Sequence, residues 1–164
     1  MHAMIRLPPF RFSVPVLALA LAACGSASAQ QRETPYWATI DTTKLNMRVG
    51  PSTEYRIDWV YRRKGMPLKV LRMKDDGWRF VEDHEGAQGW VVGRMLTPDR
   101  SVLVIGDGLA PMRAEASDNA ALKWKLSPGV VAMLDECEAG WCSVSLGNRN
   151  GYVPADRLWG VGEP

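Results

Sequence analysis

The sequence predicts an all-β protein made of two tandem small β-barrels that follow a cleaved signal peptide. Three observations lead to this class. No stretch keeps an apolar period of about 3.6 residues for three turns, which an amphipathic helix requires. Glycine and proline occur at short intervals, as is typical of short strands joined by tight turns. The chain also repeats itself once, with an offset that drifts from 65 to 62 residues.

The N-terminal segment has the pattern of a secretory signal. Arg6 and Arg11 precede the apolar run "VPVLALALAA" at residues 14–23, which is too short to span a bilayer. The small residues "ASA" at 27–29 fit a signal-peptidase site. We therefore expect residues 1–29 to be a signal peptide that is removed on export.

A second way of processing this signal remains open. "LAAC" at residues 21–24 resembles the box of bacterial lipoproteins, in which the cysteine, here Cys24, becomes the lipidated N-terminus. Both alternatives export the mature chain to the periplasm or cell envelope, with a lipid anchor in the second case. No later segment is long and apolar enough to predict a transmembrane span.

The charge balance argues against nucleic acid as a partner. The chain has 20 basic and 18 acidic residues, and residues 1–29 hold two arginines and no acid, which leaves 18 of each sign in the mature protein. A protein that binds nucleic acid needs a basic face to release counterions from the phosphates. A mature net charge of zero and an exported location therefore both disfavour that class.

Four landmarks define the repeat. "LNMRVGPS" matches "LAPMRAEAS", Gly65 matches Gly129, "GWRFV" matches "GWCSV", and "GWVVGRML" matches "GYVPADRL", in the same order. The same strand order is therefore expected in both halves. If the halves share a fold, three pairs of residues should superpose: Arg48 on Arg113, Trp78 on Trp141 and Trp90 on Tyr152.

The expected strands follow one another at short intervals. In the first repeat, "PLKVLRM" at residues 67–73 alternates apolar and basic residues from Leu68 onward, as a half-buried strand does. "DDG" then turns, "WRFVED" returns, "HEGAQ" turns again and "GWVV" closes. The second repeat runs "VVAMLDEC", "EAG", "WCSVSL", "GNRN" and "GYVP". Strands of four to seven residues with tight hairpins predict a small, strongly bent barrel.

These motifs together resemble the bacterial SH3-like (SH3b) domain. The resemblance rests on "LNMR-GPS", a glycine before a strand, "DGW--V", "G--GWV" and a terminal leucine, and it covers residues 45–96 and, more weakly, 109–158. It implies an SH3-like domain 1 at residues 30–99 and an SH3-like domain 2 at residues 100–164. The second copy departs from the pattern at several positions: Ala110 and Pro111 at the Asn46 position, Glu115 and Ala116 for Gly50 and Pro51, and Tyr152 for a tryptophan.

The two remaining cysteines predict a structural disulfide. Cys137 and Cys142 flank a hairpin turn, and export places them in a compartment where disulfides persist. A redox pair is less favoured, because the spacing is C-x4-C and no helix N-terminus is indicated that would lower a thiol pKa. A zinc site is also disfavoured, because two sulfurs without nearby histidines make only half of a tetrahedral site.

No set of residues predicts catalysis, a metal or a cofactor. A hydrolase needs a nucleophile, a base and an orienting group, and His84, the single histidine after residue 29, lies in a different repeat from both cysteines. Acidic residues gather at the predicted turns without the order of a calcium loop. We interpret these clusters as solvated turn residues, and we expect a protein without catalytic residues.

Aromatic residues in the first repeat are the candidates for a binding groove. Each aromatic alone is more simply explained as core filling, but as a set they could form the aromatic groove with which SH3-type folds hold extended peptides. Regular alternation also places Trp78 on the face opposite Val81, which predicts partial exposure of the indole. The predicted groove residues are Arg48, Tyr55, Trp59, Tyr61 and Trp78.

Charge and family resemblance together suggest a binding module. Residues 30–99 hold 12 basic and 10 acidic residues, whereas residues 100–164 hold 6 and 8. This split could let the two halves pack against each other or let the first repeat meet an anionic partner, although a solvated face is the commoner meaning of such charges. The resemblance implies an exported, non-catalytic module that binds cell-wall peptide or glycan, or an envelope protein. The alternative is a structural or assembly factor of the cell envelope, with two barrels fused as a rigid unit and no small-molecule site.

Overall fold

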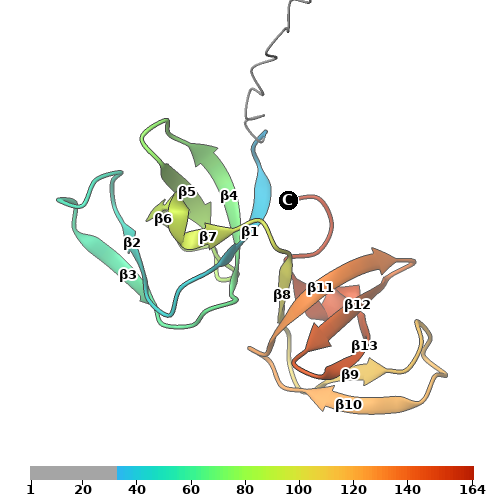
Figure 1. Ribbon diagram of the computed structural model, residues 1–164. Coiled ribbons are helices and arrows are strands. Elements are labelled where there is room, and N and C mark those ends of the chain that lie inside the picture. The colour runs from blue at the N-terminus through green and yellow to red at the C-terminus, as the bar shows by residue number, and fades with distance from the viewer. Residues whose placement is uncertain (1–32) are drawn as a thin grey trace, which may run out of the picture. The chain divides into compact units, whose positions relative to one another are not determined.

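The computed structural model describes residues 33–164, which form two seven-stranded antiparallel sheets and two short 3-10 helices (Figure 1). This confirms the predicted all-β class of two tandem small barrels. The signal segment, both processing alternatives and Cys24 lie outside the described residues. A search of residues 33–164 finds no helix of the length and hydropathy that a membrane span requires.

The first sheet is built from residues 36–97. Its spatial order is β3-β2-β6-β5-β4-β1-β7. Along the chain, the 3-10 helix η1 (Gly93–Met95) lies between β6 and β7. The strands are β1 (Tyr36–Ile40), β2 (Leu45–Arg48), β3 (Ile57–Tyr61), β4 (Pro67–Met73), β5 (Trp78–Glu82), β6 (Gln88–Val92) and β7 (Leu96–Thr97).

The second sheet repeats this arrangement. Its order, β10-β9-β13-β12-β11-β8-β14, is that of the first sheet with every strand number raised by seven. The 3-10 helix η2 (Ala155–Arg157) takes the place of η1. The strands are β8 (Ser101–Val104), β9 (Ala110–Arg113), β10 (Leu122–Leu126), β11 (Val131–Glu138), β12 (Trp141–Leu146), β13 (Arg149–Pro154) and β14 (Leu158–Trp159).

Strand register confirms the predicted equivalences. Arg48 pairs with Trp90 between β2 and β6, and Arg113 pairs with Tyr152 between β9 and β13. Trp78 and Trp141 each begin the returning strand of a hairpin, where they pair with Val92 and Pro154. The internal repeat in the sequence is therefore a repeat of the fold.

Each barrel has its own apolar core. Alternation along the strands turns every second side chain inward, and residues such as Ile40, Leu45 and Leu68 in the first barrel are fully buried. In the second barrel, Met112, Val144 and Val153 hold the corresponding interior. The cores are small, so the loops and the hairpin ends lie at the surface.

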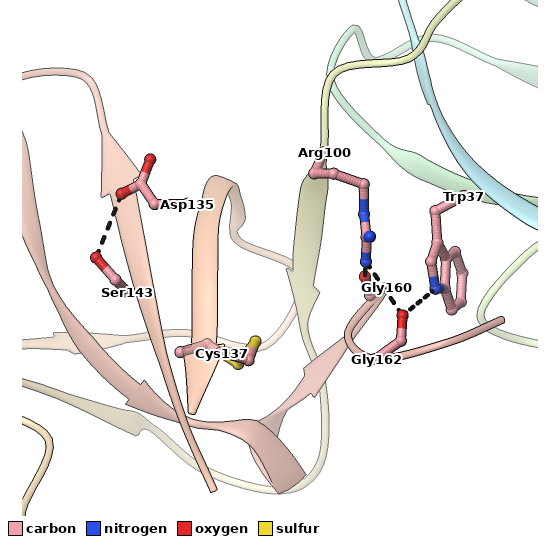
Figure 2. Close-up of a disulfide and its surroundings, with 8 residues drawn as sticks. Trp37, Arg100, Asp135, Cys137, Ser143, Gly160 and Gly162 are labelled. Carbon is pink, nitrogen blue, oxygen red and sulfur yellow. Dashed lines mark hydrogen bonds between the residues drawn. A yellow bond between two sulfur atoms is a disulfide. The ribbon is translucent and has the colours of Figure 1, made fainter. Parts of the chain in front are cut away.

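The disulfide between Cys137 and Cys142 joins β11 to β12, as predicted (Figure 2). The two residues are direct register partners, and their Cα atoms are 4.0 Å apart. In the first barrel, the corresponding partners on β4 and β5 are Met73 and Arg79. The cysteines therefore replace an ordinary cross-strand pair near the tip of a hairpin that both repeats share.

Trp159 in β14 and the residues that follow it contact the first barrel. The Trp37 indole N–H donates to the Gly162 carbonyl at 3.0 Å, and the Arg100 guanidinium donates to the Gly160 carbonyl at 2.9 Å (Figure 2). The Trp37 and Trp159 rings meet edge to face with centroids 4.7 Å apart. Strands distant in the sequence are thus joined by hydrogen bonds and by an aromatic pair.

Candidate functional site

The loop between β2 and β3 is held in shape by local hydrogen bonds. The Arg48 guanidinium donates to the Tyr55 carbonyl, and the Val49 N–H donates to the Arg56 carbonyl at 3.2 Å. In the second barrel, Arg113 makes the equivalent bond to the Ala120 carbonyl at 2.8 Å. The arginine that both repeats share therefore fixes this loop, and in the first barrel it fixes the backbone of Tyr55.

The Tyr55 ring lies directly on Gly50. A Cβ atom added at Gly50 would come within 2.6 Å of three atoms of the Tyr55 ring, so only glycine permits this approach. The tyrosine remains 50% exposed. The second barrel has Ala120 and Glu115 at the matching positions, so it lacks both the ring and the glycine. The "GPS" motif of the first repeat thus supports an exposed aromatic ring.

Four exposed apolar side chains gather on this hairpin. The described residues expose seven large apolar side chains, and four of them lie between positions 49 and 59. Contiguous apolar surface on a small domain is typical of a binding site. We call this set the hairpin patch: Val49, Tyr55, Ile57 and Trp59.

Two of the five predicted groove residues are buried. Tyr61 is 4% exposed, belongs to the first core, and donates its hydroxyl hydrogen to Asp83 Oδ2 at 2.8 Å. Burial and the bond to the Asp83 carboxylate hold the pKa of the Tyr61 phenol well above its usual range. Tyr61 therefore fills the core, which is the simpler of the two explanations considered for each aromatic alone.

The expectation that Trp78 is partly exposed was wrong. Trp78 lies outside the core cluster, as alternation against Val81 predicts, but it is only 9% exposed. The chain after β6 closes against the turn before Trp78, since the Gly93 N–H donates to the Gly77 carbonyl at 2.8 Å. This close approach leaves little room for solvent around the indole.

Trp59 has a counterpart in the second barrel, but the surroundings differ. Trp59 pairs with Met47 in register, as Trp124 pairs with Met112. The Trp124 ring has the Lys123 ammonium 5.0 Å away, and Arg149 also lies near it. Within residues 33–164 no cation is placed over the ring of Trp59, which is 54% exposed. Of the predicted groove residues, Arg48, Tyr55 and Trp59 lie on the β2–β3 hairpin, where Arg48 donates to the Tyr55 carbonyl and Trp59 shares the face of Met47, opposite to that of Arg48.

A basic pocket adjoins the hairpin patch through Arg48. It has a volume of about 280 Å³ and no acidic residue in its lining. Sequence reasoning missed Lys44, Asn46 and Arg94, although the alternation of Asn46 and Arg48 along one face of β2, directly after Lys44, was a usable signal. The residues that line the basic pocket are Lys44, Asn46, Arg48, Thr53, Val92, Arg94 and Met95.

Other cations that stood out in the sequence have internal partners. Lys64 forms an ion pair with Asp41 at 2.7 Å, and Lys74 forms one with Asp76 at 2.9 Å. The Arg72 guanidinium lies 4.4 Å from the centroid of the Phe80 ring. The Lys44 and Arg94 side chains of the basic pocket, in contrast, have no such partner within the described residues.

The described residues offer few groups for covalent chemistry or metal binding. Both sulfurs of Cys137 and Cys142 are used in the disulfide, and the His84 ring stands 6.3 Å from the Trp159 ring. A search of residues 33–164 finds no group of three or more histidine, cysteine or acidic side chains placed to hold a metal ion.

Comparison with known proteins gives one family and one curated relative. The family model described as bacterial SH3 domain matches residues 42–97 and again residues 106–160. A protein of Bacillus subtilis (strain 168), named "Putative N-acetylmuramoyl-L-alanine amidase YrvJ", is 27% identical over 131 residues. The match covers 70% of this chain and 25% of that protein, so the chain spans about a quarter of its relative's length.

Solved structures with some similarity include two proteins titled as NlpC proteins. NlpC2 from Trichomonas vaginalis has a TM-score of 0.35 and 14% identity, over 79% of this chain and 49% of that chain. An NlpC/P60 family protein from Bacillus cereus ATCC 10987 has a TM-score of 0.34 and 12% identity, over 75% of this chain and 55% of that chain. Similarity at this level supports no inference about the chain.

Proposed function

The chain belongs to the bacterial SH3 domain family, with two copies of the domain, and from that premise we propose that it is an exported, non-catalytic module that binds cell-wall peptidoglycan. The site of binding is the hairpin patch of the first repeat together with Arg48. The name of the Bacillus subtilis relative, an amidase of N-acetylmuramoyl-L-alanine, supports the cell wall as the location of the ligand. An envelope protein is the other class of partner that such a surface would fit.

The observation that carries this proposal is the presentation of Tyr55. Its backbone is bonded to Arg48 and its ring rests on Gly50, so an exposed aromatic is held in one place before any ligand arrives. A preorganised ring gives a large contact area at a low entropy cost. Ile57 and Trp59, on the strand that follows, are exposed as well.

The non-catalytic role is supported by the chemistry of the described residues. The cysteines of the second repeat are bonded to each other, and His84 lies beside Trp159 rather than beside a nucleophile. A hydrolase would need a base and a nucleophile within hydrogen-bonding reach. Binding, in contrast, needs only the exposed surface that the first repeat offers.

The test measures retention of the full-length gene product, purified from the envelope fraction, on purified peptidoglycan. We expect Tyr55→Ala and Trp59→Ala each to cost about 1 to 3 kcal/mol of binding, because truncation removes an aromatic anchor. Both rings are half-exposed, so circular dichroism should report an unchanged fold. Trp124→Ala is the matched control, because it removes the equivalent ring in the second repeat. Loss of retention in Trp124→Ala alone would move the site to the second repeat.

A structural or assembly role is the second candidate function. The hydrogen bonds of Trp37 to Gly162 and of Arg63 to Gly129 favour it, since they would stiffen the protein as a spacer between envelope partners. A protein with this role would be retained on envelope proteins in a crosslinking search and would not be retained on bare peptidoglycan. Experiments with the same purified protein therefore distinguish the two candidate functions.

A further inference from the structure

The basic pocket lies on the outer face of the first sheet, between β2 and the end of β6. Alternation along β2 places Asn46 and Arg48 on the same face, and Arg48 is paired with Trp90 on β6. Two positions further along each strand, Asn46 and Val92 both line the pocket. Arg94, in η1, and Lys44, which directly precedes β2, line the same pocket. Three cationic side chains from two parts of the chain, residues 44–48 and η1, thus line one cavity.

The positive charge of the basic pocket has no internal counter-charge. The ion pairs found among residues 33–164 use Arg56, Lys64 and Lys74, none of which lines the pocket. Within the same residues, neither the Lys44 ammonium nor the Arg94 guanidinium has a hydrogen-bond or ion-pair partner. Like charges held close together raise the local potential and attract an anion. A carboxylate is the anion that lysine and arginine bind with charge-assisted hydrogen bonds.

Asn46 adds a second requirement for a ligand of the basic pocket. Its Oδ1 atom is buried and has no hydrogen-bond partner within the described part of the chain. A buried acceptor without a donor is unfavourable, and a ligand that brings an N–H group would satisfy it. The group suited to this pocket therefore carries a carboxylate and an N–H donor close together. The C-terminal residue of a peptide has this arrangement, since its amide N–H and its carboxylate share one Cα atom.

The second repeat has a pocket at the same place with the opposite charge. Its lining includes Pro111, Asp118 and Asp156. Asp118 follows Ser117 as Thr53 follows Ser52, and the two serines accept equivalent hydrogen bonds within their loops. Asp156 is the middle residue of η2, as Arg94 is of η1.

The arginine that lines this second pocket does not restore a positive potential there. The Arg157 Nε and one of its terminal nitrogens donate to the backbone carbonyls of Ile105, Asp107 and Gly108. Two carboxylates at the matching positions would repel a third. The fold therefore provides the cavity in both repeats, and only the first repeat supplies the charge that an anion requires.

We propose that the basic pocket binds the free carboxylate end of a wall peptide, with Lys44 and Arg94 holding the carboxylate and Asn46 accepting from the adjacent amide N–H. This inference rests on the proposed function and names the group that the first repeat recognises. The hairpin patch then holds the preceding part of the peptide, because Arg48 and the loop at Thr53 border both surfaces. The ligand is a chain end rather than a continuous strand.

The experiment compares native peptidoglycan with peptidoglycan whose carboxyl groups have been converted to amides by a carbodiimide and ammonia. We expect retention of the wild-type protein to fall about tenfold or more on the amidated wall, because an amide carries no charge to pair with two cations. On the native wall, Arg94→Asp, which introduces the residue of the second repeat, should fall by a similar factor. Arg62→Asp is the matched control: it changes the same charge at an exposed position outside the pocket, and its retention should stay at the wild-type level.

The outcomes separate this inference from the proposed function. Equal wild-type retention on both walls, with loss in Tyr55→Ala, would overturn the carboxylate pocket and leave wall binding intact. If retention fell as much in Arg62→Asp as in Arg94→Asp, general charge rather than the pocket would be responsible, and the inference would be wrong.

A soluble probe tests the pocket even if the wall is not bound. N-acetyl-Ala-Ala with a free C-terminal carboxylate is titrated into the labelled full-length protein, and its C-terminal amide serves as the matched probe. We expect the NMR signals of Asn46 and Arg94 to shift with the acid and not with the amide. Equal shifts with both probes, or none with either, would overturn the inference, whereas the proposed function is judged on retention by the wall alone.

Discussion

Tyr61 and Tyr55 show how two tyrosines six positions apart take different roles. The Tyr61 hydroxyl donates to Asp83, whose other carboxylate oxygen accepts from the Glu85 and Ala87 N–H groups at 3.0 and 2.9 Å. Asp83 is itself 5% exposed, so this network ties β3 to the turn before β6 inside the protein. Tyr55, in contrast, has its ring at the surface on Gly50. One tyrosine stabilises the barrel and the other is available to a ligand.

Tyr61→Phe should lower the unfolding free energy by about 1 to 3 kcal/mol at neutral pH, because it removes a hydrogen bond to a buried carboxylate. The raised pKa of Tyr61 also predicts a pH dependence. Above a pH of about 10 the unfolded chain loses the phenolic proton while the folded chain keeps it, so this stabilisation is present at lower pH and declines as pH rises further.

The measurement is denaturant unfolding between pH 8 and 11, in buffers of about equal ionic strength. The wild type should lose stability at the alkaline end more steeply than Tyr61→Phe. Tyr55→Phe is the control and should behave as the wild type, because that ring is half-exposed. Parallel alkaline losses in the wild type and in Tyr61→Phe would contradict the role of this phenol.

At the scale of the element, the β11–β12 hairpin differs from its counterpart β4–β5 by the disulfide. Both hairpins have a bulge at the same place, after Leu134 and after Val70. In the second repeat the bulged residue Asp135 accepts a hydrogen bond from the Ser143 hydroxyl at 3.3 Å (Figure 2). The disulfide closes the end of this irregular ladder, where Glu138 and Trp141 are the final pair.

Reduction of the disulfide should lower the unfolding free energy by about 2 kcal/mol, the value that the loss of restraint on a loop of this length gives in the chain-entropy model. Urea midpoints of the wild type with and without a reducing agent measure this effect. The double variant Cys137→Ala/Cys142→Ala should be insensitive to the reducing agent. A wild-type midpoint that does not move on reduction would show that the hairpin needs no restraint.

The strands that the sequence predicted are those with clear turn chemistry on both sides. "PLKVLRM" is β4 residue for residue, and the returning strands β5 and β12 begin at the predicted tryptophans. The short strands β7 and β14 have two residues each, which is too few for any periodicity to appear. They are formed by pairing with β1 and β8, and such partners are set by the tertiary fold.

The candidate site was predictable only in part, for a reason that β3 makes clear. Trp59 and Tyr61 are two positions apart and share one face of the strand, so alternation treats them alike. Tyr61 lies opposite the core residue Leu45, whereas Trp59 lies nearer the free end of the hairpin and is exposed. The distance of a residue from the end of a sheet is not encoded in a period of two. Arg94 was missed because it lies in η1, whereas Asn46 and Arg48 in the same pocket come from β2, which is distant in the sequence.

At the scale of the whole described molecule, the contact of Trp37 with residues 159–162 links strands from both sheets. Thr39 adds a buried hydroxyl pair with Ser101 at 2.7 Å and also donates to the Asp99 carbonyl at 2.6 Å. Arg100 is partly desolvated here, and this burial lowers the pKa of its guanidinium from the usual value. The hydroxyl groups of Thr39 and Ser101 thus satisfy one another near the connection of the two sheets, whereas the buried Arg100 Nε has no hydrogen-bond partner among the described residues.

Trp37→Ala and Trp159→Ala should be non-additive in their effect on the unfolding free energy. An edge-to-face aromatic pair contributes about 0.5 to 1.5 kcal/mol beyond its buried area, and either single change removes it. A double-mutant cycle by denaturant unfolding measures this coupling. Trp37→Ala with Trp124→Ala is the control cycle and should be additive within about 0.5 kcal/mol. Additivity in both cycles would contradict an energetic link between the two rings.

The same contact has a consequence for the order in which the parts of the chain fold during synthesis. The strands of the first sheet all lie before residue 98, so they can pair as soon as that part of the chain has emerged, and N-terminal units generally fold first. The hydrogen bond of the Trp37 indole forms later, because the carbonyl that accepts it lies 125 positions further along the chain. Until then its indole is open to water and to passing proteases and chaperones. A chain that lacks the second repeat therefore leaves the Trp37 indole without its hydrogen-bond acceptor and without the ring of Trp159, in addition to the Trp59 ring that the folded protein exposes.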